Sequence, residues 1–409
     1  MIDETEAPRT PPIDPATFDR LRDAVVTAGP AAAAEQLVAY LRDSGDFPNL
    51  FYALLLKKRV ELGVSPFPTG PSSELPSETH EPYENAIRQA GREVGHALLA
   101  RKQFLAAWTF FRMLDEPEPV RAALEEYRAG DDDESDYAVI ELAWQTGLAP
   151  KKGFDVLLER RGLCSAITLV SGADLSRNPE LRDYCYGKLV RTLYEQLRER
   201  LRHELVARGT EVPADATVAA LVESHPELFA DDAYHIDTSH LSSVVQMSTY
   251  LPPGQDNELA QELCEYGRRL APALQGRNDP PFEDGYEDYL AFLKVIAGSA
   301  PSRRATDRAE VEAGLARFRG KAERQAAEGS TYAAQVYVQL LVRTDRPVEA
   351  LAAARQFLLA EDERNLICPG VSELAKKLGD FETVAEAARA RNDLVNFVAG
   401  LIAARATAD

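Results

Sequence analysis

The stretch RTDRPVEALAAA (Arg343–Ala354) contains a turn that is followed at once by a helix-forming run, and KLGDFETVAEAA (Lys377–Ala388) repeats its form. A small or polar pair precedes a proline or an aromatic residue, and apolar residues then recur at helical spacing. Two earlier stretches share the form, SGDFPNLFYALL (Ser44–Leu55) and ARKQFLAAWTFF (Ala100–Phe111). This recurrence predicts a chain built from helix–turn–helix units. The equivalent residues in the four copies are Phe47, Phe104, Pro347 and Phe381.

The clearest single helix is predicted at CYGKLVRTLYEQLRERLRHELVARG (Cys185–Gly209). Gly209 is expected to end it, because glycine readily takes the left-handed conformation that follows a helix. Oppositely charged pairs, Glu199 with Arg202 and Arg200 with Glu204, are expected on its exposed faces. Other long segments show the same apolar spacing of three and four, and no alternating run indicates a sheet, so we predict an all-α fold. The leucines of the expected buried face are Leu189, Leu193, Leu197, Leu201 and Leu205.

Proline and glycine divide this helical pattern. Two irregular regions are expected, near residues 65–82 and 275–306, the second enclosing a short helix. The acidic, proline-containing residues 1–16 predict a disordered lead. We therefore expect a helical repeat region over residues 17–298, with 65–82 as a loop or strap, and further helical repeats over residues 307–409.

Pro347 and Phe381 are 34 residues apart, and this period resembles that of the tetratricopeptide repeat. The resemblance extends to the second copy of the turn, where small and large residues alternate at spacings similar to those of that family. It implies an α-α superhelix or solenoid of antiparallel helix pairs, whose concave face binds peptides or other proteins. The residues that carry this second likeness are Gly95, Leu98, Phe104, Ala107, Phe111 and Pro119.

The composition narrows the classes of partner. With 66 acidic against 46 basic side chains, the formal charge of −20 disfavours nucleic acid and anionic membranes, which bind through Lys and Arg. No apolar run approaches the roughly 20 residues that a membrane span needs. The four cysteines lie far apart and form no CxxC pair, which is typical of a reducing cytoplasm. The excess of arginine over lysine favours a bacterial source, and we expect a cytoplasmic location.

One short stretch suggests a metal-binding site. In YHIDTSHLSS (Tyr234–Ser243), two histidines flank an aspartate. His235, Asp237 and His240 together offer three ligands for a divalent ion such as Zn²⁺, which would activate a water molecule for hydrolysis. In a continuous helix, however, His235 and Asp237 would point about 200° apart.

The same residues also fit the start of a helix. Asp237 or Thr238 is a good N-cap for a helix running to about Leu251, with His240 in its first turn. In a third interpretation, Tyr234, His235 and His240 form a polar patch that binds a ligand or partner. We favour the helix cap over the metal site, because a spacing this loose matches many sequences by chance.

No other motif indicates catalysis. The sequence has no phosphate-binding glycine loop and no GxSxG nucleophile motif, and the acidic run GDDDESD (Gly130–Asp136) lacks the spacing of an EF-hand. The leading hypothesis is therefore a scaffold that binds another protein or peptide, without a cofactor and without catalysis of its own. The alternatives are a metal-dependent helical hydrolase and a structural subunit of a bacterial assembly. Neither the oligomeric state nor the identity of the partner follows from the sequence.

Overall fold

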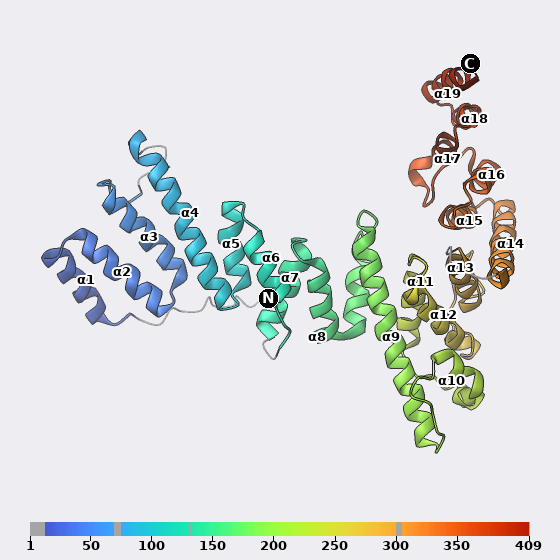
Figure 1. The fold of residues 1–409 in the computed structure, drawn as a ribbon, viewed down its shortest axis with the longest axis horizontal. Helices are drawn as coiled ribbons and strands as arrows, with labels where there is room; N and C mark the ends of the chain where they lie inside the picture. Colours follow the sequence, from blue (N-terminus) through green and yellow to red (C-terminus); the bar gives the residue numbers. More distant parts are fainter. Residues whose placement is uncertain (1–12, 69–74, 131–132, 300–304, 409) are drawn as a thin grey trace, which may run out of the picture. The chain divides into compact units, whose positions relative to one another are not determined.

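A computed structural model describes residues 13–68, 75–130, 133–299 and 305–408 (Figure 1). These residues form nineteen α-helices and a few short 3-10 helices, with no strand among them, so the predicted all-α class is confirmed. The chain divides into two compact units, residues 1–160 and 161–409. No helix within the described ranges is long and apolar enough to cross a bilayer.

In the first unit, each helix packs mainly against the next one along the chain. Its buried core runs from Val38 to Val156 and is rich in valine, leucine and phenylalanine. The helices are α1 (Pro15–Thr27), α2 (Pro30–Ser44), α3 (Phe47–Glu61), α4 (Ser77–Ala100), α5 (Phe104–Leu114), α6 (Glu118–Glu126), α7 (Asp133–Gln145) and the first part of α8 (Pro150–Ser171).

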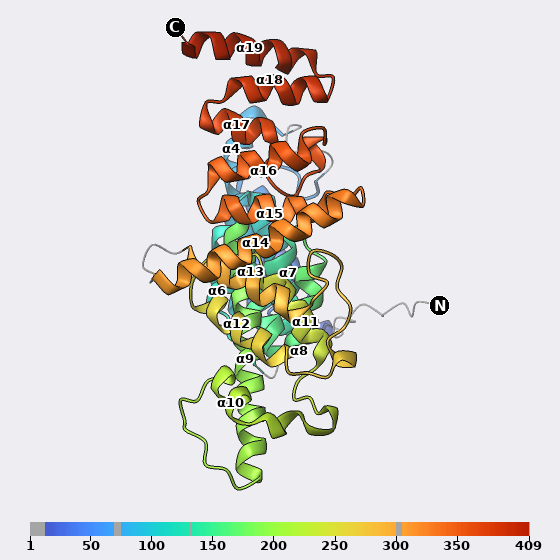
Figure 2. The ribbon, with the colours of Figure 1, turned by 90° about the vertical axis from the view of Figure 1, so that its right-hand side faces the viewer.

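The second unit continues this sequential packing after α8, in which Gly162 interrupts the helix with a φ of 75°. A long helix, α9, packs against three shorter ones, and the last six helices lie side by side in chain order (Figure 2). The helices are α9 (Pro179–Ala207), α10 (Val218–Ser224), α11 (Thr238–Ser248), α12 (Gln255–Gly267), α13 (Tyr286–Gly298), α14 (Ala305–Ala327), α15 (Tyr332–Arg343), α16 (Pro347–Leu358), α17 (Val371–Leu378), α18 (Phe381–Ala390) and α19 (Leu394–Ala408).

The four repeated turns join helices that pack against each other, as the sequence predicts. Each turn connects one pair: α2 with α3, α4 with α5, α15 with α16, and α17 with α18. Aspartate caps two of the helices that follow, because Asp46 accepts from the Asn49 amide at 3.3 Å and Asp380 from the Thr383 amide at 3.0 Å. The turn motif therefore marks a helical hairpin. The equivalent residues Phe47, Phe104, Pro347 and Phe381 are the first residues of α3, α5, α16 and α18.

The small–large pattern around Phe104 has the expected physical basis. Gly95 on α4 lies against the Phe111 ring on α5, and a Cβ added at Gly95 would come within 2.6 Å of that ring. Leu98, Phe104 and Phe111 are buried. The glycine thus permits the close approach of α4 and α5, which buries the large side chains between them.

The irregular regions are shorter than predicted. The loop expected over 65–82 ends before Ser77, where α4 begins, and residues 69–74 lie outside the described ranges. Pro82 lies in the second turn of α4 and removes one backbone hydrogen bond, but burial of Tyr83, Val94 and the rest of that face offsets this loss. In the second region α13 is the predicted short helix, and α14 begins at Ala305, just before the expected end of the region. Of the expected disordered lead, residues 1–12 are not described, and α1 begins at Pro15.

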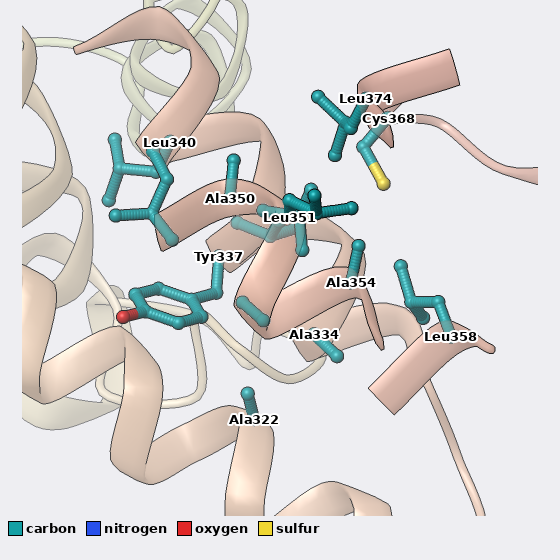
Figure 3. Packing of buried hydrophobic residues seen from close by; sticks show 14 of the residues in the cluster. Ala322, Ala334, Tyr337, Leu340, Ala350, Leu351, Ala354, Leu358, Cys368 and Leu374 are labelled. Carbon is teal, nitrogen blue, oxygen red and sulfur yellow. The ribbon is translucent and has the colours of Figure 1, made fainter. Parts of the chain in front are cut away.

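The packing of the C-terminal helices is continuous across the subdomain boundary predicted near 298–307. One buried cluster extends from Phe292 on α13 to Ala387 on α18. Figure 3 shows its centre, where Tyr337 and Leu340 of α15 meet Ala350, Leu351 and Ala354 of α16. The division between compact units instead falls within α8. The core continues across the interval 298–307 because α13 and α14, on its two sides, pack together.

Helix α9 confirms the strongest prediction of the sequence. All five predicted leucines are buried, and Gly209 follows the helix with a φ of +81°. The expected pair of Arg200 with Glu204 is replaced by other contacts of both residues. Arg200 donates to the His235 carbonyl at 2.8 Å, and Glu204 pairs with Arg208 and contacts His235. Arg202 reaches the carbonyls of Pro213 at 3.2 Å and Ala214 at 2.5 Å.

Candidate functional site

The segment Tyr234–Asp237 joins a short 3-10 helix (Pro226–Asp232) to α11 as an irregular stretch that bends at His235 and Ile236. Its position depends on α9, because Arg200 holds the His235 carbonyl. His235 and Ile236 are buried, whereas Tyr234 is 58% exposed.

The His235 side chain is enclosed by α9 and α12. Its backbone amide donates to the Tyr266 hydroxyl at 2.8 Å, and its Nδ1 lies 3.1 Å from the same hydroxyl. The hydroxyl hydrogen is thus directed at Nδ1, which leaves the proton of the neutral ring on Nε2, 3.0 Å from Glu204 Oε2. Burial lowers the pKa of His235, although the Glu204 carboxylate opposes this effect.

Asp237 is the N-cap of α11, which confirms the cap interpretation. Its carboxylate accepts from the Ser239 amide at 2.8 Å, the Ser239 hydroxyl at 2.6 Å and the His240 amide at 3.3 Å. The Ser239 hydroxyl, the largest contribution, lowers the pKa of Asp237. His240 lies half-buried in the first turn, as the sequence predicts.

The structure does not gather these residues into one site. His235 faces inward to Glu204 and Tyr266, Asp237 caps the helix, and Tyr234 points to solvent. Across the described ranges, no three His, Cys, Asp or Glu side chains form a group that could hold a metal ion. Neither the metal alternative nor the Tyr234–His235–His240 patch therefore gains support from geometry. The contacts of His235 and Asp237 stabilise the local fold.

Comparison with known proteins gave no match. This holds for models of protein families, for curated protein sequences and for solved structures.

A pocket of about 310 Å³ lies elsewhere in the second unit. Aromatic rings form much of its wall, and Arg182 lies over the Tyr250 ring at 5.4 Å. Two arginines line it and no acidic residue does, although the chain as a whole is strongly acidic. The pocket is therefore an aromatic cavity with two arginines, of which Arg182 is paired with Asp183 at 2.8 Å. Its lining residues are Arg182, Thr249, Tyr250, Phe282, Phe292, Tyr332, Val336, Gln339, Arg343 and Ile367.

Arg343 is the most unusual group in this pocket. Its guanidinium donates to the carbonyls of Thr249 and, at 2.6 Å, Leu251, and lies 5.8 Å from the centre of the Phe292 ring. No described carboxylate lies within ion-pair distance of it, and burial lowers its pKa to about 10. At neutral pH Arg343 still carries a full positive charge. An anionic group on a ligand would therefore find a guanidinium here that lies near Asp183 but forms no ion pair among the described residues.

Sequence reasoning missed this pocket. Its residues come from α9, α13 and α15 and from three segments between helices, and no two of its aromatic residues belong to one recognisable motif. Arg343 lies four residues before Pro347 in the repeated turn, yet the equivalent residues of the other copies are Asp43, Ala100 and Lys377. This difference was the only local feature of the sequence that could have pointed to the pocket.

Proposed function

We propose that the protein is a tetratricopeptide-like helical-repeat scaffold of the cytoplasm, which binds a segment of another protein. Two features support a repeat scaffold: the shared turn that begins four helices, and the packing of each helix mainly against its neighbours in sequence. Such an array exposes a large surface relative to its core and is suited to binding.

The observation that carries the proposal is the pocket containing Arg182, Tyr250, Tyr332 and Arg343. Aromatic and arginine residues are the side chains that most often dominate the binding energy of protein interfaces. The pocket is about the size of one or two large side chains. We propose that it receives an apolar anchor of the partner segment, while a carboxylate next to that anchor lies near Arg182 and Arg343.

Selection of random-sequence peptides on the immobilised full chain tests this proposal. We expect the selected peptides to combine an aromatic or large aliphatic residue with a neighbouring acidic residue. Synthetic copies of these peptides should bind the wild type, measured by fluorescence polarisation. Replacement of the peptide's acidic residue by its amide should weaken binding about tenfold, because a charge-assisted contact is lost.

The variant Tyr332→Ala removes one wall of the pocket, and its side chain is partly exposed, so the fold should tolerate the change. We expect it to weaken peptide binding by at least about tenfold. Tyr52→Ala, at an exposed tyrosine of the first unit, is the matched control and should bind as the wild type does. Peptides that bind Tyr332→Ala and the wild type equally would place the binding site elsewhere.

A further inference from the structure

The last helix, α19, has an apolar face that no described residue covers. Leu394, Val395, Val398, Leu401 and Ile402 are between 48% and 80% exposed. They follow the spacing of one helical face, and α19 is the outermost of the side-by-side helices in Figure 2. The end helix of a repeat array normally has a polar outer face, because nothing stacks on it. The composition of α19 is therefore that of a helix with a further neighbour.

The opposite face of α19 is already occupied. Gly400 lies so close to α18 that an added Cβ would come within 2.9 Å of the Ala385 amide nitrogen. This contact fixes the rotation of α19 about its own axis. The exposed stripe therefore cannot turn inward to pack on α18 without losing the close approach at Gly400.

The stripe is symmetric about its central residue. Val395 and Leu401 lie three residues before and after Val398, and Leu394 and Ile402 lie four residues before and after it. An antiparallel copy of the same helix would thus place leucine opposite isoleucine and valine opposite leucine, with the two Val398 side chains meeting on the two-fold axis. This self-complementarity is what a two-fold interface requires.

The charge of α19 also favours a second copy of the chain as its partner. In a chain of net charge −20, residues 394–408 contain no acidic side chain and one basic side chain, Arg405. Two copies can therefore approach through α19 without the repulsion that most of their surface would produce. The five residues expose roughly 600 Å² per copy, the size at which an apolar patch on a monomer is normally functional. Burying this area on two copies would approach the lower limit of the area that specific interfaces bury.

We infer that α19 is a self-association surface and that its partner is the α19 of a second copy, packed antiparallel about Val398. This inference concerns a different surface from the pocket of the proposed function and does not depend on it. Dimerisation would join two arrays end to end and give each assembly two copies of the pocket.

Light scattering of the full chain after size exclusion, across a dilution series from micromolar to nanomolar, tests the inference. We expect a mass of twice 45.0 kDa at micromolar concentration. Val398→Glu would bring two carboxylates together on the axis and should weaken the dimer at least about 100-fold. Val348→Glu is the matched control, at an exposed valine of α16, and should remain dimeric. A monomeric wild type, or a Val398→Glu chain that dimerises as tightly, would overturn the inference.

Cysteine cross-linking tests the geometry independently. Cys164 is the one exposed cysteine among the described residues and would first be replaced by serine. In that background Val398→Cys should form a disulfide-linked dimer on mild oxidation. Leu394→Cys should not, because the two copies of residue 394 would be about 12 Å apart along the helix axis. Cross-linking through residue 394 and not through residue 398 would contradict the antiparallel arrangement.

Discussion

Helices α9 and α19 carry similar apolar stripes in different surroundings. The five leucines of α9 are almost completely buried, because α10, α11 and α12 pack against that helix. The five apolar residues of α19 face outward, and the contacts of α19 are mainly with α18. The comparison teaches that periodic apolar spacing identifies a face to be covered, but not the element that covers it. That element is part of the same chain for α9, and we infer a second chain for α19.

The largest difference between the two stripes should appear in stability. Leu197→Ala removes a fully buried side chain of α9 and should lower the free energy of unfolding of the second unit by about 2–5 kcal/mol. Leu394→Ala in α19, 78% exposed, should change it by less than about 0.5 kcal/mol in dilute, monomeric protein. Urea unfolding followed by circular dichroism measures both.

Tryptophan fluorescence supplies the control for that experiment. Trp108 and Trp144 both belong to the first unit and report on it directly. A Leu394→Ala chain as unstable as Leu197→Ala at low concentration would show that the α19 stripe is covered within one chain.

A smaller effect is expected where α9 meets the His235 segment. Replacing His235 with leucine removes the contacts of the ring with Tyr266 and Glu204, which should cost about 1–3 kcal/mol near neutral pH. It should also flatten the pH dependence of stability. Because burial lowers the pKa of His235, this side chain binds a proton more readily in the unfolded chain than in the folded one. The contribution of His235 to stability is therefore complete above about pH 6.5 and is lost as the pH falls below that value.

Thermal melts between pH 7.5 and pH 5, values chosen to bracket the ordinary histidine pKa, measure this dependence. His240→Leu, at the half-buried histidine of the same segment, is the control and should keep the slope of the wild type. If His235→Leu retains the full slope, another group is responsible for it.

The smallest effect concerns the cap of α11. Asp237→Ala removes the acceptor of two backbone amides and should lower stability by about 1 kcal/mol. Asp237→Asn should retain most of the wild-type stability, because asparagine caps a helix equally well without the charge. The difference in melting temperature between these two variants measures the cap directly. Equal losses would indicate that the charge of Asp237, rather than its cap geometry, is what matters.

Local features of the fold could be predicted from the sequence because their signals are local. The leucines of α9 recur every four residues, and Asp237 precedes a helical run that ends before two prolines. The four turns could be placed to the residue, since a small or polar pair and a following aromatic residue or proline mark each helix start. In each case the residues that determine the structure are neighbours in sequence.

The pocket could not be predicted, because tertiary packing brings its residues together. Arg182 on α9 and Arg343 on α15 are separated by more than a hundred residues and meet through the end of α11. The histidine segment misled for the opposite reason: its residues are close in sequence, but the chain bends at His235, which faces inward, while Asp237 caps the helix. Sequence proximity does not determine whether side chains converge.

Hydrogen exchange measured at two protein concentrations tests the comparison of α9 with α19 most directly. We expect protection of the α9 amides to be the same at nanomolar and at micromolar concentration, because α9 is covered within one chain. Protection of the α19 amides, and of those in the adjoining α18, should rise with concentration and should lose this rise in Val398→Glu. Protection of α19 that is independent of concentration would contradict the account.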